Sequence, residues 1–510
     1  MNRAVFYDNI LRIQYIKEQR MQQTKKVLSR KCELPAKKEL TTENQFNAKD
    51  FTAQSRTASE NKLAKGLMTD GIIYKQLLFF SLPLILGNLF QQLYNIVDSI
   101  IVGNFIGGNA LAAVGAGSAV INLLIGLLVG LTTGAGVVVS QFFGAGDPQK
   151  VKQSVHTAFA FTLIFGLIIS LVGIFVSDYI LIWTNTPPQV FDQASVYLKI
   201  FFSGLIFLTI YNMGAGILRA VGDSKTPLYY LGVACFVNIV LDILFVVVIG
   251  MGVEGVAIAT LIAQAAAALL TVHKLMISSQ SCRLILKEIS IYGPRLRQIL
   301  YIGIPSGMQQ MIISLSNVII QGYINGFGAD AMAGWSAYSK LDGILLLPIF
   351  SFGLAMTTFT GQNIGAAKLD RIRQGAKSCL YMSCGFSLAA SLIMYLYGGY
   401  VFRIFTSETN VLQHAVYMMK GLIPFYFLLA VIQVYSGVIS GAGRSFASMI
   451  IMVINMCVIR IILLWFIAPL FPDVRSIFYA YIISWLGCAV CMVLYYLKGS
   501  WKNTSLQPGI

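Results

Sequence analysis

The second half of the chain repeats the first at a nearly constant spacing. Positions 82–83 (Leu-Pro) correspond to positions 304–305 (Ile-Pro), and Asn95 corresponds to Asn317 at the same spacing. After a slip of one position, segment 141–145 (Gln-Phe-Phe-Gly-Ala) corresponds to segment 362–366 (Gln-Asn-Ile-Gly-Ala). Duplicated and very apolar chains build two helical bundles around a site near the membrane midplane. The repeat therefore predicts two related lobes in a membrane.

The composition supports the same interpretation. The chain is 56% hydrophobic and 11% charged, whereas soluble domains average about 25% charged residues. From Leu77 onward it contains continuous apolar runs that are long enough to cross about 30 Å of hydrocarbon as helices, rather than alternating as barrel strands do. Twelve such runs are centred near residues 90, 125, 166, 206, 238, 265, 311, 346, 388, 426, 457 and 486.

These runs predict an all-α membrane protein with twelve transmembrane helices in two six-helix bundles around a central cavity. Six spans in each half is an even number, so both halves enter the bilayer in the same orientation and the repeat is parallel. We expect a cytoplasmic, disordered amino-terminal tail (1–70), a first bundle (71–278), a cytoplasmic linker (279–295), a second bundle (296–498) and a cytoplasmic tail (499–510).

Lysine and arginine are concentrated in the loops after the even-numbered spans, which predicts that these loops and both termini face the cytoplasm. We expect a multi-pass protein of the plasma (inner) membrane. This topology and the basic tail explain the formal charge of +16 better than a nucleic-acid surface does. The basic loop residues are Lys150, Lys152, Arg219, Lys225, Lys274, Arg283, Lys287, Arg295, Arg297, Lys368, Arg371, Arg373, Lys377 and Arg444.

Two acids are expected inside the membrane in the first half. Asp98 lies in the first span, and Asp242 lies four residues after Asn238 in the fifth, on the same helix face. A carboxylate at this depth costs at least about 2.5 to 3.5 kcal/mol, so it must be paired, hydrated or protonated. The two interpretations are a structural hydrogen-bond network and an ion-coupling site. Ile320 and, allowing for a gap, Arg460 occupy the equivalent positions of the second half, which favours ion coupling in the first half alone.

The second half has its own charged residues, Lys340, Asp342 and Arg460. We expect a polar network in which Asp342 pairs with Arg460 or Lys340, with a substrate-facing Asp342 as the alternative. Pro83 interrupts the backbone hydrogen bonds of the first span, so it is either a static kink or a moving hinge.

Other motifs exclude some classes of protein. The GxGxxG match at residues 250–255 lies between two spans and follows no strand, so we interpret it as a chance match. There is no Walker A sequence, and the three histidines have no metal-ligand spacing. We therefore expect neither an ATPase nor another membrane enzyme.

Several segments together resemble the multidrug and toxic compound extrusion (MATE) family of secondary transporters, over residues 68–498. They are segments 82–83, 91–95 (Gln-Gln-Leu-Tyr-Asn), 98–103 (Asp-Ser-Ile-Ile-Val-Gly), 110–115 (Ala-Leu-Ala-Ala-Val-Gly), 218–223 (Leu-Arg-Ala-Val-Gly-Asp) and 361–366 (Gly-Gln-Asn-Ile-Gly-Ala). The resemblance implies a monomer that exports amphipathic or cationic organic compounds in exchange for H⁺ or Na⁺ and needs no cofactor. The alternative is a lipid-linked oligosaccharide flippase, which related duplicated transporters resemble.

The resemblance also implies which residues form the ion site. Asp98, Asn238, Asp242 and Thr260 match the amino-lobe pattern of the DinF-like branch, where they would carry the proton or hold Na⁺, and Tyr197 matches its helix-4 tyrosine. Spans 7 and 10 contain no Asp or Glu. Their sequences therefore disfavour a cation site in the second lobe.

Overall fold

The computed structural model describes residues 68–278, 281–403 and 408–503, and residues 66–510 belong to one compact unit. The expected amino-terminal tail lies outside the described residues except for Met68, Thr69 and Asp70. The described part of the chain is helical and contains no strand.

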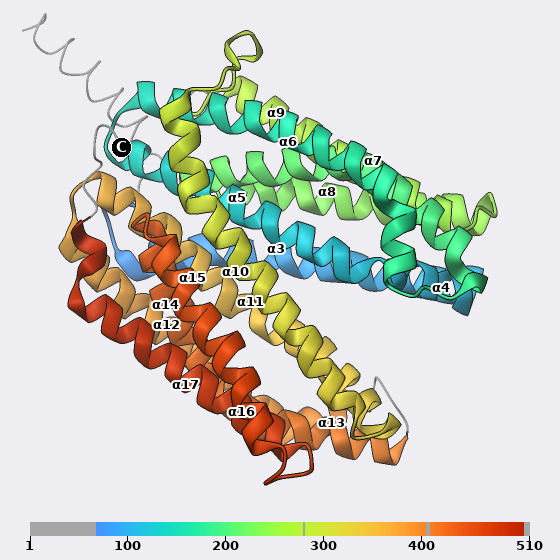
Figure 1. The fold of residues 1–510 in the computed structure, drawn as a ribbon. Helices are drawn as coiled ribbons and strands as arrows, with labels where there is room; N and C mark the ends of the chain where they lie inside the picture. The colour runs from blue at the N-terminus through green and yellow to red at the C-terminus, as the bar shows by residue number, and fades with distance from the viewer. Residues whose placement is uncertain (1–67, 279–280, 404–407, 504–510) are drawn as a thin grey trace, which may run out of the picture. The chain divides into compact units, whose positions relative to one another are not determined.

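The first lobe is built from the helices that precede residue 278 (Figure 1). They are α3 (Ile73–Ile101), α4 (Gly108–Ala116), α5 (Ser118–Gly144), α6 (Pro148–Trp183), α7 (Pro188–Ala220), α8 (Lys225–Asp242) and α9 (Val253–Ile277). Two of them continue as π-helical turns, α3 through Val102–Ile106 and α8 through Ile243–Val248.

The second lobe follows the loop after α9. Its helices are α10 (Gly293–Asn325), α11 (Ala329–Gly365), α12 (Leu369–Phe402), α13 (Thr409–Leu422), α14 (Tyr426–Gly441), α15 (Ser445–Val453), α16 (Arg460–Ile467) and α17 (Arg475–Lys498). A 3₁₀ turn (Ile423–Phe425) joins α13 to α14, and a π-helical turn (Ile454–Ile459) joins α15 to α16, so each pair is one span.

The expected twelve-helix architecture is confirmed. Eleven helical spans in the described residues are long and apolar enough to cross a membrane. The twelfth, α10, has the length but a more polar sequence, with Ser306, Gln309 and Gln310 near its middle. We attribute this polarity to its position, because α10 packs along α5 rather than facing only lipid.

Glycine lets the two lobes approach at backbone distance. The helices α5 and α10 cross side by side (Figure 1). A Cβ atom built on Gly130 would lie 2.0 Å from the backbone nitrogen of Gly307, and one on Gly134 would lie 2.6 Å from the Cα of Gly303. Real side chains do not fit at such distances, so this crossing depends on Gly130 and Gly134, whereas a Cβ atom on Gly303 or Gly307 would make a tight contact of 3.0 Å with α5.

Helix α3 packs against both lobes. Its first turns place Leu77, Phe80 and Leu84 in a buried cluster with residues of α11, α12 and α14. Farther along, α3 packs against α8, where the Cys235 thiol is 3.7 Å from the carbonyl oxygen of Phe90. Pro83 is buried within the first part and lies close to the change of partner. The helix is continuous around it, and whether it moves stays a prediction.

Candidate functional site

The structure brings the expected amino-lobe residues together where α3, α8 and α9 meet. Asp98 comes from α3, Asn238 and Asp242 from α8, and Thr260 from α9. The carboxyl groups of Asp98 and Asp242 lie within hydrogen-bonding reach of one another. The Asn238 Nδ2 atom is 3.5 Å from the Thr260 hydroxyl. Three helices therefore place four oxygen-bearing side chains at one point inside the lobe.

These side chains carry buried oxygen atoms that no donor among the described residues satisfies. They are Oδ1 of Asp98, Oδ1 of Asn238, and both Oδ1 and Oδ2 of Asp242. Asp242 is fully buried and Asn238 is 1% exposed. Desolvating an unpaired charge costs on the order of several kcal/mol, and two adjacent carboxylates also repel one another.

A cation would relieve both costs. A proton on one carboxyl group could be donated to the other, and Na⁺, a hard cation, favours oxygen ligands of the kind that Asp98, Asn238, Asp242 and Thr260 provide. The residues fit either ion. The chemistry that these side chains would supply is a site for one positive charge away from water.

Two tyrosines flank the acid pair. Tyr197 of α7 and Tyr94 of α3 both interact electrostatically with Asp98 and Asp242. Tyr197 is expected from the sequence, whereas the position of Tyr94, one turn before Asp98, is not recognised there as part of the site. Gln264 is missed as well, although it follows Thr260 by one helical turn and its Oε1 atom is buried without a donor in the described part of the chain. The spacing of four residues, which relates Asn238 to Asp242, is the signal for both.

The second-lobe acid has a different environment. Asp342 of α11 accepts hydrogen bonds from the Tyr338 hydroxyl at 3.4 Å and from the Tyr426 hydroxyl. The two hydroxyl groups are 2.8 Å apart. Asp342 is thus held by neutral donors.

The expected pairing of Asp342 with Arg460 or Lys340 is wrong. Among the described residues, neither side chain forms an ion pair with Asp342. Arg460 is 1% exposed, donates to the Ser484 hydroxyl at 3.0 Å and lies 4.1 Å from the Tyr481 ring centre. Lys340 is exposed. The physical reason is that tyrosine hydroxyls donate to Asp342, whereas Arg460 lies over an aromatic face and donates to Ser484.

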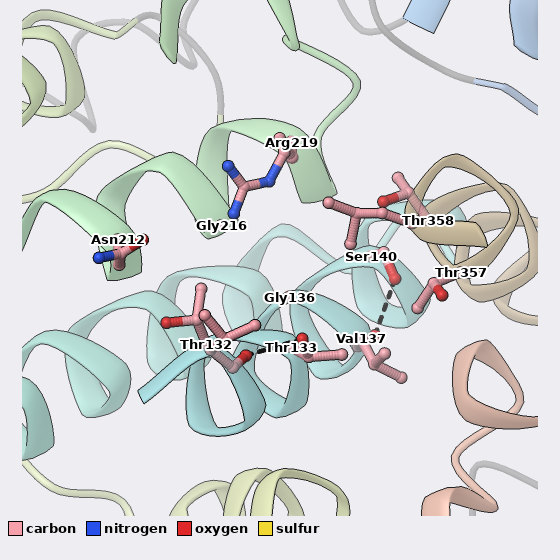
Figure 2. A pocket seen from close by; sticks show the side chains of 12 residues that line it. Thr132, Thr133, Gly136, Val137, Ser140, Asn212, Gly216, Arg219, Thr357 and Thr358 are labelled. Atoms are coloured by element: carbon pink, nitrogen blue, oxygen red, sulfur yellow. Dashed lines mark hydrogen bonds between the residues drawn. The ribbon is translucent and has the colours of Figure 1, made fainter. Parts of the chain in front are cut away.

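Three cavities follow one another through the first lobe because neighbouring cavities share lining residues. The first lies between α5, α7 and α11 (Figure 2) and shares Asn212 and Arg219 with the second. The second shares Gln91 and Gln264 with the third, which also contacts Thr260. The series therefore runs from the space between the lobes to the side of the acid site.

Arg219 corrects one topological prediction. The sequence assigns it to a loop, but α7 continues to Ala220, and Gly222 in the turn that follows has a φ of +91°, which favours glycine. Arg219 is consequently in the last helical turn and lines two of the cavities.

Two equivalent glutamines join the lobes at the end where α5, α7, α11 and α14 finish. The Gln141 Nε2 atom donates to the Gly441 carbonyl at 2.9 Å, and the Gln362 Nε2 atom donates to the Ala220 carbonyl, also at 2.9 Å. The repeat relates position 141 to position 362 and, at the same spacing, position 220 to position 441. Gln362 also accepts from the Met68 backbone N–H at 2.6 Å. We name these contacts the glutamine clasp.

The comparisons with known proteins identify the same repeat. The family model MatE matches residues 83–244 and again residues 305–466, once in each lobe. Together the two matches cover well over half of the chain.

Relatives and solved structures agree with this match. "Probable multidrug resistance protein YpnP" of Bacillus subtilis (strain 168) is 30% identical over 448 residues, which are 86% of this chain and 98% of that protein. "FAD transporter" of Shewanella oneidensis is 24% identical over 404 residues, 77% of this chain and 86% of that protein. The structure "Crystal structure of MATE in the bent conformation" covers 86% of this chain and 98% of its own, with a TM-score of 0.80 at 22% identity, and shows a shared fold.

Proposed function

Since this chain belongs to the MatE family of multidrug transporters, we propose that it is a secondary antiporter that exports amphipathic organic compounds in exchange for H⁺ or Na⁺. It is a multi-pass membrane transporter and not an enzyme. We place it in the plasma membrane with both termini in the cytoplasm. The names of its relatives favour export over the flippase alternative.

The observation that carries the proposal is the group of unsatisfied oxygen atoms at Asp98, Asn238 and Asp242. A buried pair of carboxyl groups without donors is far more stable with a cation or a shared proton than without one. We propose that the entering ion neutralises this pair and that Thr260 and Tyr197 help to orient it.

We propose that α3 transmits this change to the lobes. Its first turns pack in the second lobe, and its later part carries Asp98 in the first. Pro83 lacks the backbone N–H that would stabilise a straight helix, so bending there costs less than elsewhere. Movement of Asp98 on neutralisation would therefore shift the contact between lobes.

The ion gradient supplies enough free energy. One elementary charge that crosses about 100 mV yields roughly 2.3 kcal/mol, and one pH unit adds about 1.36 kcal/mol. Together they sustain a concentration ratio of about several hundredfold for a neutral compound.

Dye accumulation in everted membrane vesicles, whose lumen corresponds to the outside of the cell, tests the proposal, with proton and sodium gradients imposed separately. We expect one of the two gradients to drive transport. Dye movement that is equal with and without either gradient, at matched protein level, would contradict coupling.

A further inference from the structure

The first of the three cavities contains a positive charge without a partner. Arg219 directs its guanidinium group into the space between α5, α7 and α11 (Figure 2). Within the described residues its side chain forms no ion pair and donates no hydrogen bond. Asp223, four residues farther along the chain, is engaged by Thr226, which donates to it through its backbone N–H at 3.0 Å and its hydroxyl at 2.6 Å.

Hydroxyl groups of both lobes complete the donor set. Thr132 of α5 and Thr358 of α11 line the same cavity, and in the described part of the chain neither hydroxyl has a hydrogen-bond partner. The other lining hydroxyls include Thr133 and Ser140, which donate within their own helix to Val129 and Val137. The free donors are therefore Arg219, Thr132 and Thr358.

The cavity offers no compensating negative charge. The residues that line this cavity and the two that continue from it include no Asp or Glu. Inside a membrane protein the effective dielectric constant is low, so an unpaired guanidinium repels a cation strongly and attracts an oxyanion. Its planar fork also matches the two oxygens of a carboxylate or phosphate.

The repeat does not keep an arginine at the position of Arg219. The helix equivalent to α7 is α14, and Ser440 occupies the position that the repeat relates to Arg219. Both helices end one residue after this position. The arginine is therefore a special feature of the first lobe.

We propose that this cavity binds an oxyanion group, carboxylate or phosphate, of the transported compound, so that anionic or zwitterionic amphipathic molecules are preferred over purely cationic ones. This inference rests on the proposed function and names its substrate class. Because Thr358 belongs to the second lobe and Arg219 and Thr132 to the first, separation of the lobes removes a donor and weakens binding. That difference in affinity between two states is what a transport cycle requires.

Binding of two xanthene dyes to the purified full-length chain in detergent tests the inference. The probes are fluorescein, which carries a carboxylate, and rhodamine 6G, which is cationic; fluorescence anisotropy gives each Kd. Because Arg219 would donate charge-assisted hydrogen bonds to the carboxylate, Arg219→Gln should weaken fluorescein binding about tenfold or more. Arg219→Lys should restore most of it, and rhodamine 6G should bind Arg219→Gln at least as well as the parent.

Arg373→Gln is the matched control, because it removes one positive charge from an exposed pair with Asp370 outside the cavity. It should leave both Kd values unchanged. Equal fluorescein binding by the parent and Arg219→Gln, or no fluorescein binding by a parent that binds rhodamine 6G, would overturn the inference. Displacement of fluorescein by phosphatidylglycerol, without displacement by soluble acetate or phosphate, would assign the donors to a lipid headgroup and overturn it too.

Asp242→Asn separates this inference from the proposed function. If transport of either dye continues in Asp242→Asn, the coupling proposal fails, whereas the effect of Arg219→Gln on fluorescein binding still stands. If Asp242→Asn abolishes transport but Arg219→Gln binds fluorescein as tightly as the parent, only the substrate inference fails.

Discussion

The acids of the two lobes have the same side chain but different surroundings. Asp342 accepts hydrogen bonds from two tyrosine hydroxyls, whereas Asp98 and Asp242 lie beside one another with buried oxygens for which the described part of the chain provides no donor. An acid held by fixed neutral donors has little need of an ion. A pair without such donors is stabilised by one, so we propose that coupling occurs in the first lobe and that Asp342 has a structural role.

The largest expected effect comes from removing an acid of the first lobe. Asp242→Asn removes the charge that the incoming ion neutralises, so gradient-driven efflux should fall to the level of vesicles without the protein. Asp342→Asn is the matched change in the other lobe and should retain most of the activity, because the amide oxygen can still accept from Tyr338 and Tyr426. Dye accumulation in everted vesicles at matched protein level measures both. Loss of transport in Asp342→Asn alone would reverse the assignment.

The burial of Asp342 depends on the hydrogen bonds from its two tyrosine donors. Tyr426→Phe removes one of its two donors and leaves a buried acceptor less satisfied, which should cost about 1 to 3 kcal/mol of stability. Thermal unfolding in detergent should therefore occur at a lower temperature, while the ion dependence of transport stays as in the parent. An altered ion dependence without a change in stability would give Asp342 a role in coupling.

The glutamine clasp extends the comparison to the contact between the lobes. Gln362 makes two of its hydrogen bonds and Gln141 makes one. Each bond contributes about 0.5 to 1.5 kcal/mol, so Gln362→Ala should open this end of the molecule more than Gln141→Ala.

Distances between spin labels on α5 and α11 near the clasp would measure the opening. Gln321→Ala is a suitable control, because Gln321 makes an exposed side-chain hydrogen bond to Asn325 and both residues belong to α10. If the two clasp variants shift the distance distribution no more than the control does, the glutamine clasp does not hold the lobes together at this end.

The smallest expected effect concerns Asp70, an exposed acid with which the buried acids of the two lobes are compared. The Lys368 hydrogen bond lowers the pKa of Asp70. The hydrogen bond from Lys368 therefore contributes to folding stability above the unfolded-state pKa of Asp70, which is about 4. This contribution is lost as pH falls through the lower pKa of the folded state. Since the Asp70 side chain is 77% exposed, Asp70→Asn should cost less than about 1 kcal/mol near neutral pH. Unfolding curves at neutral pH and near pH 3 should show that the difference in stability between the parent and Asp70→Asn is smaller in acid.

The fold was predictable because its sequence signals are local or repeated. Apolar runs define the spans, and the nearly constant spacing between equivalent segments defines the lobes. Glycines such as Gly130 become interpretable only once α10 is known to face them, since the contact joins residues far apart in the chain.

The site was predictable only in part. Asp98 and Asp242 are conspicuous because charge inside an apolar run is costly. The tyrosines that donate to Asp342 are not distinctive in the sequence of an apolar span. The sequence therefore favours an ion pair of Asp342 with Arg460, which the described residues do not form. Arg219 looked like a loop residue because no charge pattern reveals where α7 ends.

Cation exchange at the acid pair is tested most directly by ion binding to the purified protein. Proton release, followed with a pH indicator, and ²²Na⁺ displacement should be measured when substrate is added to the parent, Asp242→Asn and Asp342→Asn. We expect the parent and Asp342→Asn to release one of the two ions and Asp242→Asn to release neither. Equal ion release from Asp242→Asn and the parent would show that the acid pair is not where the cation binds.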